Sequence, residues 1–420
     1  MERQKIIQTI TDVFRDVLDA PQLVLNEGST SSDVEGWDSL HHIQLVVSVE
    51  KAFKIRLSIQ EIQQWESVGD MVAGIAARLD ARGGGERPLA GEGREIRQQA
   101  YFKDPRQVLP LLIEGSPDIN LASWVRENKE AVEDGLIRHG GILFRGFPVY
   151  TIKEFDEFMK CWNTEPLPYM FRSSPRKELD EKVKNIYQST IYPADRNIVL
   201  HNESSYSRVW GMKIAFCCIQ PAEEGGETPL ADSRQVLRDI DPELVEKFRA
   251  KGVKYRRNLS RGLGMPWTEV FQTEDRKEVA HICKKNGIDF QFNGDDVVIE
   301  WSKPAVYEHP VSGEATWFNH VLFFHKFSRF EELDLGPDDL LPPEYLSSES
   351  FYGDGTEIGY EEYLNIRQAF QRNTVAIPYR KGDIFLLDNM LTAHGRNPYK
   401  GERIIATATI EPAYDAAYSL

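Results

Sequence analysis

The first eighty residues show apolar positions at helical spacing. In residues 6–17 they recur every three or four residues, as in a helix with one buried face. A second pattern of this kind begins at Ser39, where Asp38 or Ser39 itself can cap the helix, and shorter ones follow at 59–65 and 68–79. The pattern therefore predicts four helices, which together form a small all-α bundle.

The pattern changes at about Tyr101, where short aromatic-rich runs separated by Gly and Pro begin. Many of these runs have the length and composition of strands. Helical patterns interrupt them at 120–139, 242–251, 275–285 and 360–372. Because strands and helices do not alternate regularly, we expect an antiparallel sandwich or barrel with helical additions. The predicted strands are 141–147, 213–219, 297–301, 316–319, 384–387 and 403–410.

A glycine-rich stretch separates the two regions. Residues 82–93 contain five glycines, no aromatic residue and no hydrophobic periodicity, which is typical of a linker. We therefore expect a helical domain at 1–82, a flexible linker at 83–100 and a larger domain at 101–420.

Charge and composition narrow the classes of partner. The formal net charge is −16 and no basic cluster is present, which argues against a nucleic-acid partner, because nucleic-acid-binding proteins usually present a basic face. No apolar run approaches the ~20 residues that cross a bilayer, and the first residues lack the apolar core of a secretory signal. Cys217 and Cys218 adjoin in an apolar run, as small core residues do. We therefore expect a cytoplasmic protein without a membrane partner.

The segment Leu200–Ser204 is the best candidate for metal binding. If it continues a strand, His201 and Glu203 point to the same face, because successive side chains of a strand alternate. Two histidines and one carboxylate can hold a redox metal and leave positions open for oxygen and substrate, and His394 is the candidate for the second histidine. A lone His-x-Glu triplet also arises by chance, and a strand histidine is often structural. The rest of the chain must therefore supply the specificity.

The second predicted helix begins with Asp38-Ser39-Leu40. This segment resembles the Asp-Ser-Leu motif of acyl and peptidyl carrier proteins, and the resemblance covers residues 1–82. It implies that Ser39 receives a 4′-phosphopantetheine arm, a role that suits a helix N-terminus, whose free amides and dipole favour a phosphate. The implied partners are a phosphopantetheinyl transferase, an adenylation or acyl-loading enzyme, and other enzymes of a biosynthetic assembly line.

Further motifs lie in the larger domain. Thr228 stands in the segment Gly-Gly-Glu-Thr-Pro-Leu-Ala-Asp, His394 follows the segment Gly-Asp-Ile-Phe-Leu-Leu-Asp-Asn, and Arg403 precedes an apolar run. With His201 and Glu203, these motifs resemble the iron(II), 2-oxoglutarate-dependent dioxygenases of the taurine dioxygenase-like group, especially clavaminate synthase and the syringomycin-type aminoacyl hydroxylases. The resemblance implies a double-stranded β-helix, or jelly roll, with helical insertions.

The same resemblance assigns the cofactor residues. It implies that His201, Glu203 and His394 bind Fe(II). It also implies that Thr228 and Arg403 bind 2-oxoglutarate, and a planar guanidinium suits the distal carboxylate because it can donate two parallel hydrogen bonds.

This chain differs from taurine dioxygenase in the residues that are expected to contact the substrate. The segment Trp317-Phe318-Asn319 matches the same subgroup, which implies that Trp317 and Asn319 lie near the substrate pocket. Taurine dioxygenase has a second arginine four residues after the first, whereas this chain has Thr407. Sulfonate recognition is therefore not expected, and Arg396 is the candidate for a further anion contact.

These motifs predict a carrier domain fused to an iron(II), 2-oxoglutarate-dependent oxygenase that hydroxylates an acyl or aminoacyl group held as a thioester, in natural-product biosynthesis. Desaturation, cyclisation or oxidative decarboxylation at the same iron centre stay open, as does a non-catalytic scaffold for the carrier. Halogenases of this class have Ala or Gly at the position of Glu203, so we expect oxygenation or dehydrogenation rather than halogenation.

Overall fold

The computed structural model divides the chain into two compact units, one formed essentially by residues 1–89 and the other by the bulk of residues 90–420. The residues that the structure describes are 3–18, 20–31, 33–34, 36–37, 45–46, 48–49, 52–53, 65, 67–82, 96–102, 107–169, 171, 173–174, 176–189, 192–260, 264–339, 341–342 and 345–415.

The first unit is helical. Helix α1 spans Arg3–Leu18 and helix α4 spans Val68–Arg82. Residues 45–46, 48–49 and 52–53 between them are also helical. Apolar side chains of these segments form one core, which includes Ile6, Ile10, Phe14, Leu45, Val49, Val72 and Ile75.

This unit confirms the helices predicted at 6–17 and 68–79. Their apolar positions lie in the shared core, so the periodicity did mark the buried faces. Ser39 lies outside the described residues, as does nearly all of the helix predicted at 59–65.

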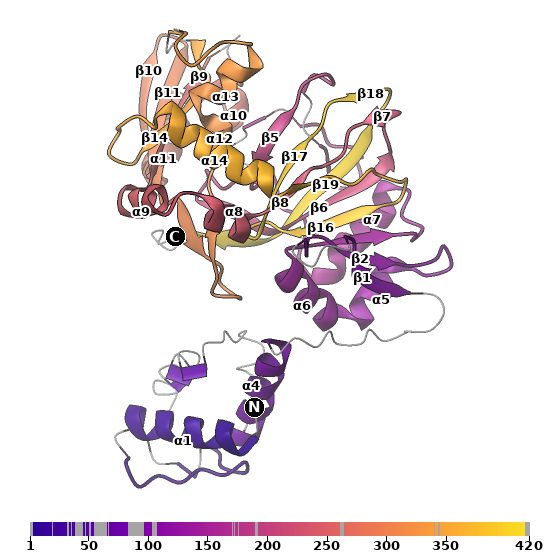
Figure 1. The fold of residues 1–420 in the computed structure, drawn as a ribbon, viewed down its shortest axis with the longest axis vertical. Coiled ribbons are helices and arrows are strands. Elements are labelled where there is room, and N and C mark those ends of the chain that lie inside the picture. The colour runs from indigo at the N-terminus through magenta and orange to yellow at the C-terminus, as the bar shows by residue number, and fades with distance from the viewer. Residues whose placement is uncertain are drawn as a thin grey trace. The chain divides into compact units, whose positions relative to one another are not determined.

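A seven-stranded sheet is the largest element of the second unit (Figure 1). The strand order is β1-β2-β3-β16-β6-β19-β4, and only the β2–β3 pair is parallel. The long strands β6 and β19 pair over most of their length. The bounds are β1 Arg97–Ala100, β2 Leu111–Glu114, β3 Gly141–Arg145, β4 Tyr187–Gln188, β6 Val209–Gln220, β16 Ile384–Asp388 and β19 Ile404–Tyr414.

A four-stranded antiparallel sheet packs against the large sheet. Its order is β15-β8-β17-β5, with bounds β5 Ile198–His201, β8 Leu230–Asp232, β15 Thr374–Val375 and β17 Thr392–Arg396. Alternate residues of β6 (Ile214, Phe216 and Cys218) share one core with Leu230 and Val375 of the smaller sheet. This period of two is what two sheets packed face to face require.

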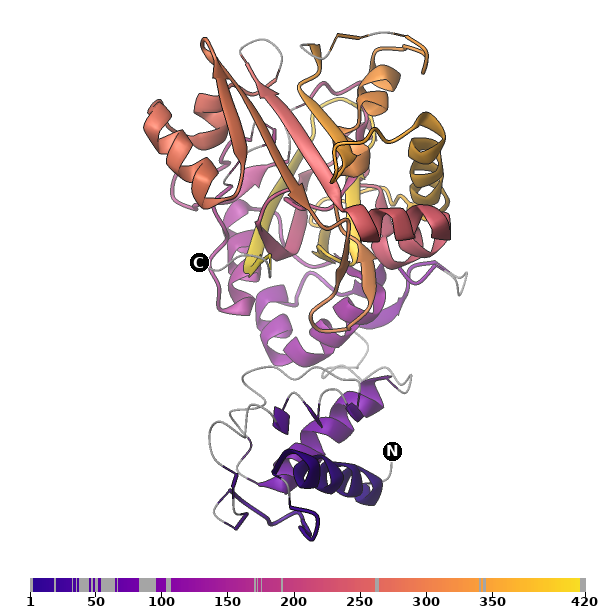
Figure 2. The same ribbon diagram turned by 90° about the vertical axis from the view of Figure 1, so that its left-hand side faces the viewer.

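A third sheet, of order β10-β11-β9-β14, forms a further layer with most of the helices; Figure 2 shows its long strands side by side. Its bounds are β9 Val253–Leu259, β10 Asp289–Asn293, β11 Asp296–Lys303 and β14 Ser348–Tyr352. Two short pairs complete the strands: β7 Glu224–Gly225 with β18 Tyr399–Lys400, and β12 Val306–Glu308 with β13 Ala315–Trp317.

The helices of this unit are short, and none in the described part of the chain has the length and hydropathy to cross a membrane. Their bounds are α5 Leu121–Glu127, α6 Lys129–His139, α7 Ile152–Met159, the 3₁₀ helix η1 Lys160–Trp162, α8 Ser233–Asp239, α9 Pro242–Lys251, α10 Trp267–Phe271, α11 Arg276–Lys285, α12 Val321–Phe324, α13 Lys326–Glu332 and α14 Tyr360–Arg372.

Two expectations need correction. The linker predicted at 83–100 is wrong in its last four residues, which form β1 and pair with β2. This edge strand is largely exposed and polar, so no apolar alternation marked it. The helix predicted at 120–139 is two helices, α5 and α6, which meet at Asn128. The Asn128 side chain donates to the carbonyl of Trp124 at 2.9 Å, a local bond that competes with helix continuation.

Candidate metal centre

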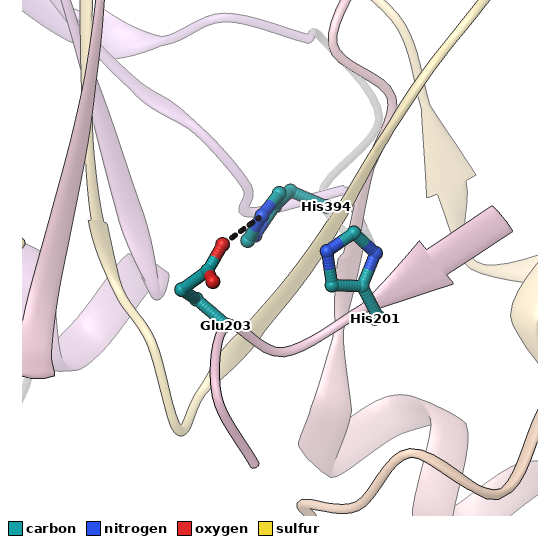
Figure 3. A group of neighbouring side chains, drawn as sticks. All are labelled: His201, Glu203 and His394. Atoms are coloured by element: carbon teal, nitrogen blue, oxygen red, sulfur yellow. Dashed lines mark ion pairs between the residues drawn. The ribbon is translucent and has the colours of Figure 1, made fainter. Parts of the chain in front are cut away.

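Two histidines face each other across strands β5 and β17. The strands pair antiparallel, and His201, the last residue of β5, is the register partner of His394 in β17. Their ring centroids lie 4.7 Å apart, and Figure 3 shows the two rings beside Glu203. Strand pairing thus joins two side chains from distant parts of the chain.

Glu203 completes the group from a turn. Because β5 ends at His201, alternation along a strand does not place Glu203, and that part of the prediction is wrong. The chain turns instead, with Ser204 at a φ of 55°. Asn389 holds this turn: its Oδ1 accepts from the backbone N–H of Glu203 at 2.7 Å, and its Nδ2 donates to the Glu203 carbonyl at 2.9 Å. The buried Asn389 amide therefore fixes the backbone that directs Glu203 toward the histidines.

The three side chains offer a compact set of ligand atoms. One atom from each of His201, Glu203 and His394 lies within 4.8 Å of the others, and Nε2 of His394 is 3.8 Å from Oε2 of Glu203. Nδ1 of His201 lies 2.8 Å from the carbonyl of Val199, to which it donates in the tautomer that leaves Nε2 with a free lone pair. Nδ1 of His394 has no partner among the described residues. Two imidazoles and a carboxylate fit a redox-active divalent metal such as Fe(II).

Burial sets the protonation of this group. Burial, together with the neighbouring His394, lowers the pKa of His201 to about 3, so the imidazole is neutral. Burial alone would raise the pKa of Glu203, but the Arg176 guanidinium and the two histidines hold it well below its usual range. A neutral imidazole and an ionised carboxylate are the forms that bind a metal.

Arg176 is a site residue that the sequence analysis missed. Its Nη2 donates to Oε2 of Glu203 at 2.6 Å, and its guanidinium lies 4.3 Å from the ring centroid of Tyr169. Both side chains of the ion pair are buried. Arg176 lies outside the helices and strands, so neither periodicity nor spacing pointed to it.

A small cavity beside the histidines brings together the residues predicted to bind the co-substrate. Thr228, Arg396 and Arg403 line it with His201 and His394. The full lining is Arg176, Ser189, Ile198, His201, Phe216, Thr228, His394, Gly395, Arg396, Arg403 and Thr407. The motifs that lie apart in sequence therefore meet at one place.

The buried Arg403 is held at the wall of this small cavity. Its Nε donates to the carbonyl of Gly226 at 2.8 Å, and its Nη1 donates to the Ser189 hydroxyl at 3.0 Å. The hydroxyls of Thr228 and Tyr379 lie 2.8 Å apart. Tyr379 is a further neighbour that no sequence motif indicated.

Arg396 anchors a loop. Its two Nη atoms donate to the carbonyls of Tyr192, Pro193 and Arg196 at 2.5–3.0 Å, while its buried Nε has no partner among the described residues. The Nε–H and the second N–H of Nη1 are thus left for the predicted anion contact. Thr407, which stands where taurine dioxygenase has arginine, also lines the cavity.

The structure does not bring Trp317 and Asn319 to either of the cavities at the metal centre. Trp317 is fully buried and packs edge-on against Phe248. The Asn319 side chain donates to the carbonyl of Ala305 at 2.7 Å and accepts from the N–H of Val321 at 3.0 Å. Both side chains are used in the core and line neither of these two cavities, so their role in the substrate pocket stays a prediction.

A second, larger cavity of about 420 Å³ adjoins Glu203. Most of its wall is apolar or aromatic, and Arg176, Glu203 and Arg208 are the charged side chains in it. Tyr169, Phe171, Tyr206, Trp210, Phe271, Ile282, Ile288 and Trp301 supply much of the apolar wall. The size and lining are those of a small-molecule pocket.

Two family models match the chain. The model described as "Taurine catabolism dioxygenase TauD, TfdA family" matches residues 106–409. The model described as "Phosphopantetheine attachment site" matches residues 8–75, a range that contains Ser39.

Individual proteins resemble the two parts of the chain. The dapdiamide synthesis protein DdaC of Enterobacter agglomerans is 34% identical over 315 residues, which cover 73% of this chain and 95% of DdaC. An acyl carrier protein of Coprothermobacter proteolyticus is 30% identical over 79 residues, 19% of this chain and 96% of that protein. Among solved structures, PvcB of Pseudomonas aeruginosa matches with a TM-score of 0.45 and 15% identity, covering 77% of this chain and 95% of PvcB.

Proposed function

Because the chain belongs to the taurine catabolism dioxygenase TauD, TfdA family and also carries a phosphopantetheine attachment domain, we propose that it hydroxylates an acyl or aminoacyl group tethered to its own carrier domain. The protein is a dioxygenase, and its cofactors are Fe(II), 2-oxoglutarate and 4′-phosphopantetheine. A role in the biosynthesis of a natural product is supported by the similarity to DdaC, a dapdiamide synthesis protein.

His201, Glu203 and His394 are the residues that would hold Fe(II). The compact donor set and the hydrogen bond that fixes the His201 tautomer both support this assignment. Iron with 2-oxoglutarate supplies the oxidising chemistry when both are bound. The chain itself keeps Glu203 ionised through Arg176, holds the turn through Asn389 and buries the side chains of Glu203 and His394.

Thr228 and Arg403 would bind 2-oxoglutarate in the small cavity. Arg403 keeps further N–H groups besides those that donate to Gly226 and Ser189, and Thr228 presents a hydroxyl to the same space. A guanidinium held from two sides is oriented before the carboxylate arrives, which lowers the entropy cost of binding. Arg396 supports the same cavity chiefly by anchoring its loop.

Ser39 would carry the phosphopantetheine arm. The family match over residues 8–75 supports this, and a phosphopantetheinyl transferase and other biosynthetic enzymes follow as partners. We further propose that an adenylation or acyl-loading enzyme supplies the substrate. The carrier domain would end near residue 82, where α4 ends, and the oxygenase domain would begin at β1.

Two finer assignments belong to the same proposal. The face-to-face packing of the two main sheets supports a double-stranded β-helix for the oxygenase domain. A reducing, cytoplasmic location accords with its four cysteines, which are all free thiols.

The observation that carries the proposal is the meeting of His201, Glu203 and His394 between two cavities in a chain that also has a carrier domain. The His201→Ala protein should lose Fe(II) affinity by more than about 100-fold, beyond the loss that is typical for an outer-shell residue, and should form no succinate from 2-oxoglutarate. Iron titration and succinate release test this, with the exposed His281→Ala as the matched control. Wild-type turnover by His201→Ala would refute the assignment.

A further inference from the structure

We propose that the 420 Å³ cavity beside Glu203 binds the acyl part of the substrate, and that Arg176 there pairs with a carboxylate which the acyl group carries. The inference rests on the proposed function and adds the substrate class: a carboxyacyl thioester rather than an aminoacyl thioester with a free ammonium.

The cavity has the form that a tethered acyl chain requires. Tyr169, Phe271 and Trp301 belong to its apolar wall. Transfer of a hydrocarbon segment from water into this cavity is therefore favourable in free energy. Glu203, a proposed iron ligand, lies in the same wall. A carbon held in this cavity would therefore lie near the metal centre, while the small cavity with Arg403 serves the co-substrate.

Arg176 is the cation that joins both cavities. It lines each of them, and its side chain is 8% exposed. One of its donors binds Glu203, but the buried Nε has no hydrogen-bond partner among the described residues. The indole N–H of Trp210, another residue of the larger cavity, also lacks a partner in the described part of the chain. Buried donors of this kind call for an acceptor from a ligand, because an unmade buried hydrogen bond is costly.

The charge balance points to an anion. Among the described residues, Arg176, Arg396 and Arg403 line the two cavities with largely buried side chains, whereas Glu203 is the one carboxylate in either wall. Fe(II) and 2-oxoglutarate carry opposite charges of equal size, so their binding leaves this excess unchanged. A buried positive charge is stable only when it is paired, so a carboxylate on the substrate would improve the balance and an ammonium would worsen it.

The test is a binding measurement with three thioesters of one length. S-succinyl, S-succinamoyl and S-(4-aminobutanoyl) pantetheine present an anion, a neutral amide and a cation. Calorimetric titration into full-length Ser39→Ala protein, which has no competing arm, is done without oxygen in the presence of Fe(II) and 2-oxoglutarate. We expect the succinyl thioester to bind about ten- to a hundredfold more tightly than the succinamoyl thioester, as a charge-assisted hydrogen bond predicts, and the 4-aminobutanoyl thioester to bind most weakly.

Two variants test whether Arg176 causes the preference for the succinyl thioester over the succinamoyl thioester. Arg176→Gln in the same background should bind the succinyl and succinamoyl thioesters equally, whereas Arg176→Lys should keep part of the preference. Arg372→Gln, at an exposed arginine of α14, is the control and should match the parent protein. Because the three-ligand comparison needs no change at Arg176, misfolding of that variant does not remove the test.

Equal affinity for the three thioesters, or tighter binding of the 4-aminobutanoyl thioester, would overturn the inference. Fe(II) and 2-oxoglutarate binding is measured on the same samples before thioester is added. If both bind and no charge preference follows, the substrate class is wrong and the proposed function stands. If neither binds to the parent protein, the proposed function itself fails.

Discussion

At the scale of single residues, the position of Glu203 depends on one amide. Asn389 accepts from the Glu203 N–H and donates to the carbonyls of Glu203 and Gly211, both at 2.9 Å. Asn202, next to Glu203, in turn donates to the carbonyl of Asn389 at 2.7 Å. These bonds tie the turn after β5 to the segment that leads into β17, and so couple Glu203 to the strand of His394.

Replacing Asn389 with Ala should therefore weaken the metal centre without removing a ligand. The change leaves one buried N–H and two buried carbonyls without this partner, at a cost of about 1–3 kcal/mol of unfolding free energy. Fe(II) affinity should fall about ten- to a hundredfold, as for other residues that orient metal ligands. Thermal unfolding and iron titration measure both effects, and Asn373→Ala at the end of α14 is the control. Unchanged iron affinity would show that Asn389 does not position Glu203.

The residues that could be predicted from sequence are those whose chemical type carries a motif. His201, Glu203 and His394 were chosen by type and order, and the structure places them together. Arg176 and Asn389 could not be found, because their contacts with Glu203 cross 27 and 186 positions of the chain. Trp317 packs against Phe248, and a matching sequence segment does not by itself reveal which way such a side chain points.

At the scale of elements, the site depends on how closely β5 approaches β17. Gly395 lies between His394 and Arg396, where the register of the pair shifts. A Cβ atom at this position would lie 2.5 Å from the carbonyl oxygen of Ile198, well inside normal contact. Any larger residue must push β5 away and move His201 relative to His394.

Gly395→Ala should thus destabilise the protein by about 1–3 kcal/mol, the usual cost of overpacking, and should weaken Fe(II) binding. Gly336→Ala is the matched control, because its added Cβ would meet its nearest atom at an ordinary 3.5 Å. Chemical denaturation gives the stability, and iron titration gives the affinity. A Gly395→Ala protein that binds iron as tightly as the wild type would contradict the idea that close strand pairing sets the spacing of the histidines.

Elements with local signals were predicted well. Helix α9 begins and ends as expected, since Asp241 caps it, Pro242 occupies its first turn and Gly252 follows it. Helix α11 begins one residue after the predicted start at 275, because Asp275 caps it. Elements that depend on contacts between distant parts of the chain were not predicted well. Strand β1 forms by pairing with β2, and β5 ends where the Asn389 contacts hold the following turn. Pairing partners distant in sequence leave no periodicity of their own.

At the scale of the whole molecule, the central feature is that carrier and oxygenase share one chain. Helix α4 ends at Arg82 and β1 begins at Arg97, so the connection can span at most roughly 50 Å even when fully extended. A tether of this size gives a local concentration on the order of millimolar. A weak encounter between the domains would then suffice, and a free acid in solution would be a poor competitor.

The most direct test follows the acyl group itself. Full-length protein is loaded on its pantetheine arm, supplied with Fe(II), 2-oxoglutarate and oxygen, and analysed by mass spectrometry of the arm together with succinate release. We expect the bound acyl group to gain one oxygen atom for each succinate formed. The Ser39→Ala protein, given the corresponding free acid, should bind iron and 2-oxoglutarate normally but oxidise almost none of the acid. Equal oxidation of the free acid by Ser39→Ala would contradict the claim that the carrier domain presents the substrate.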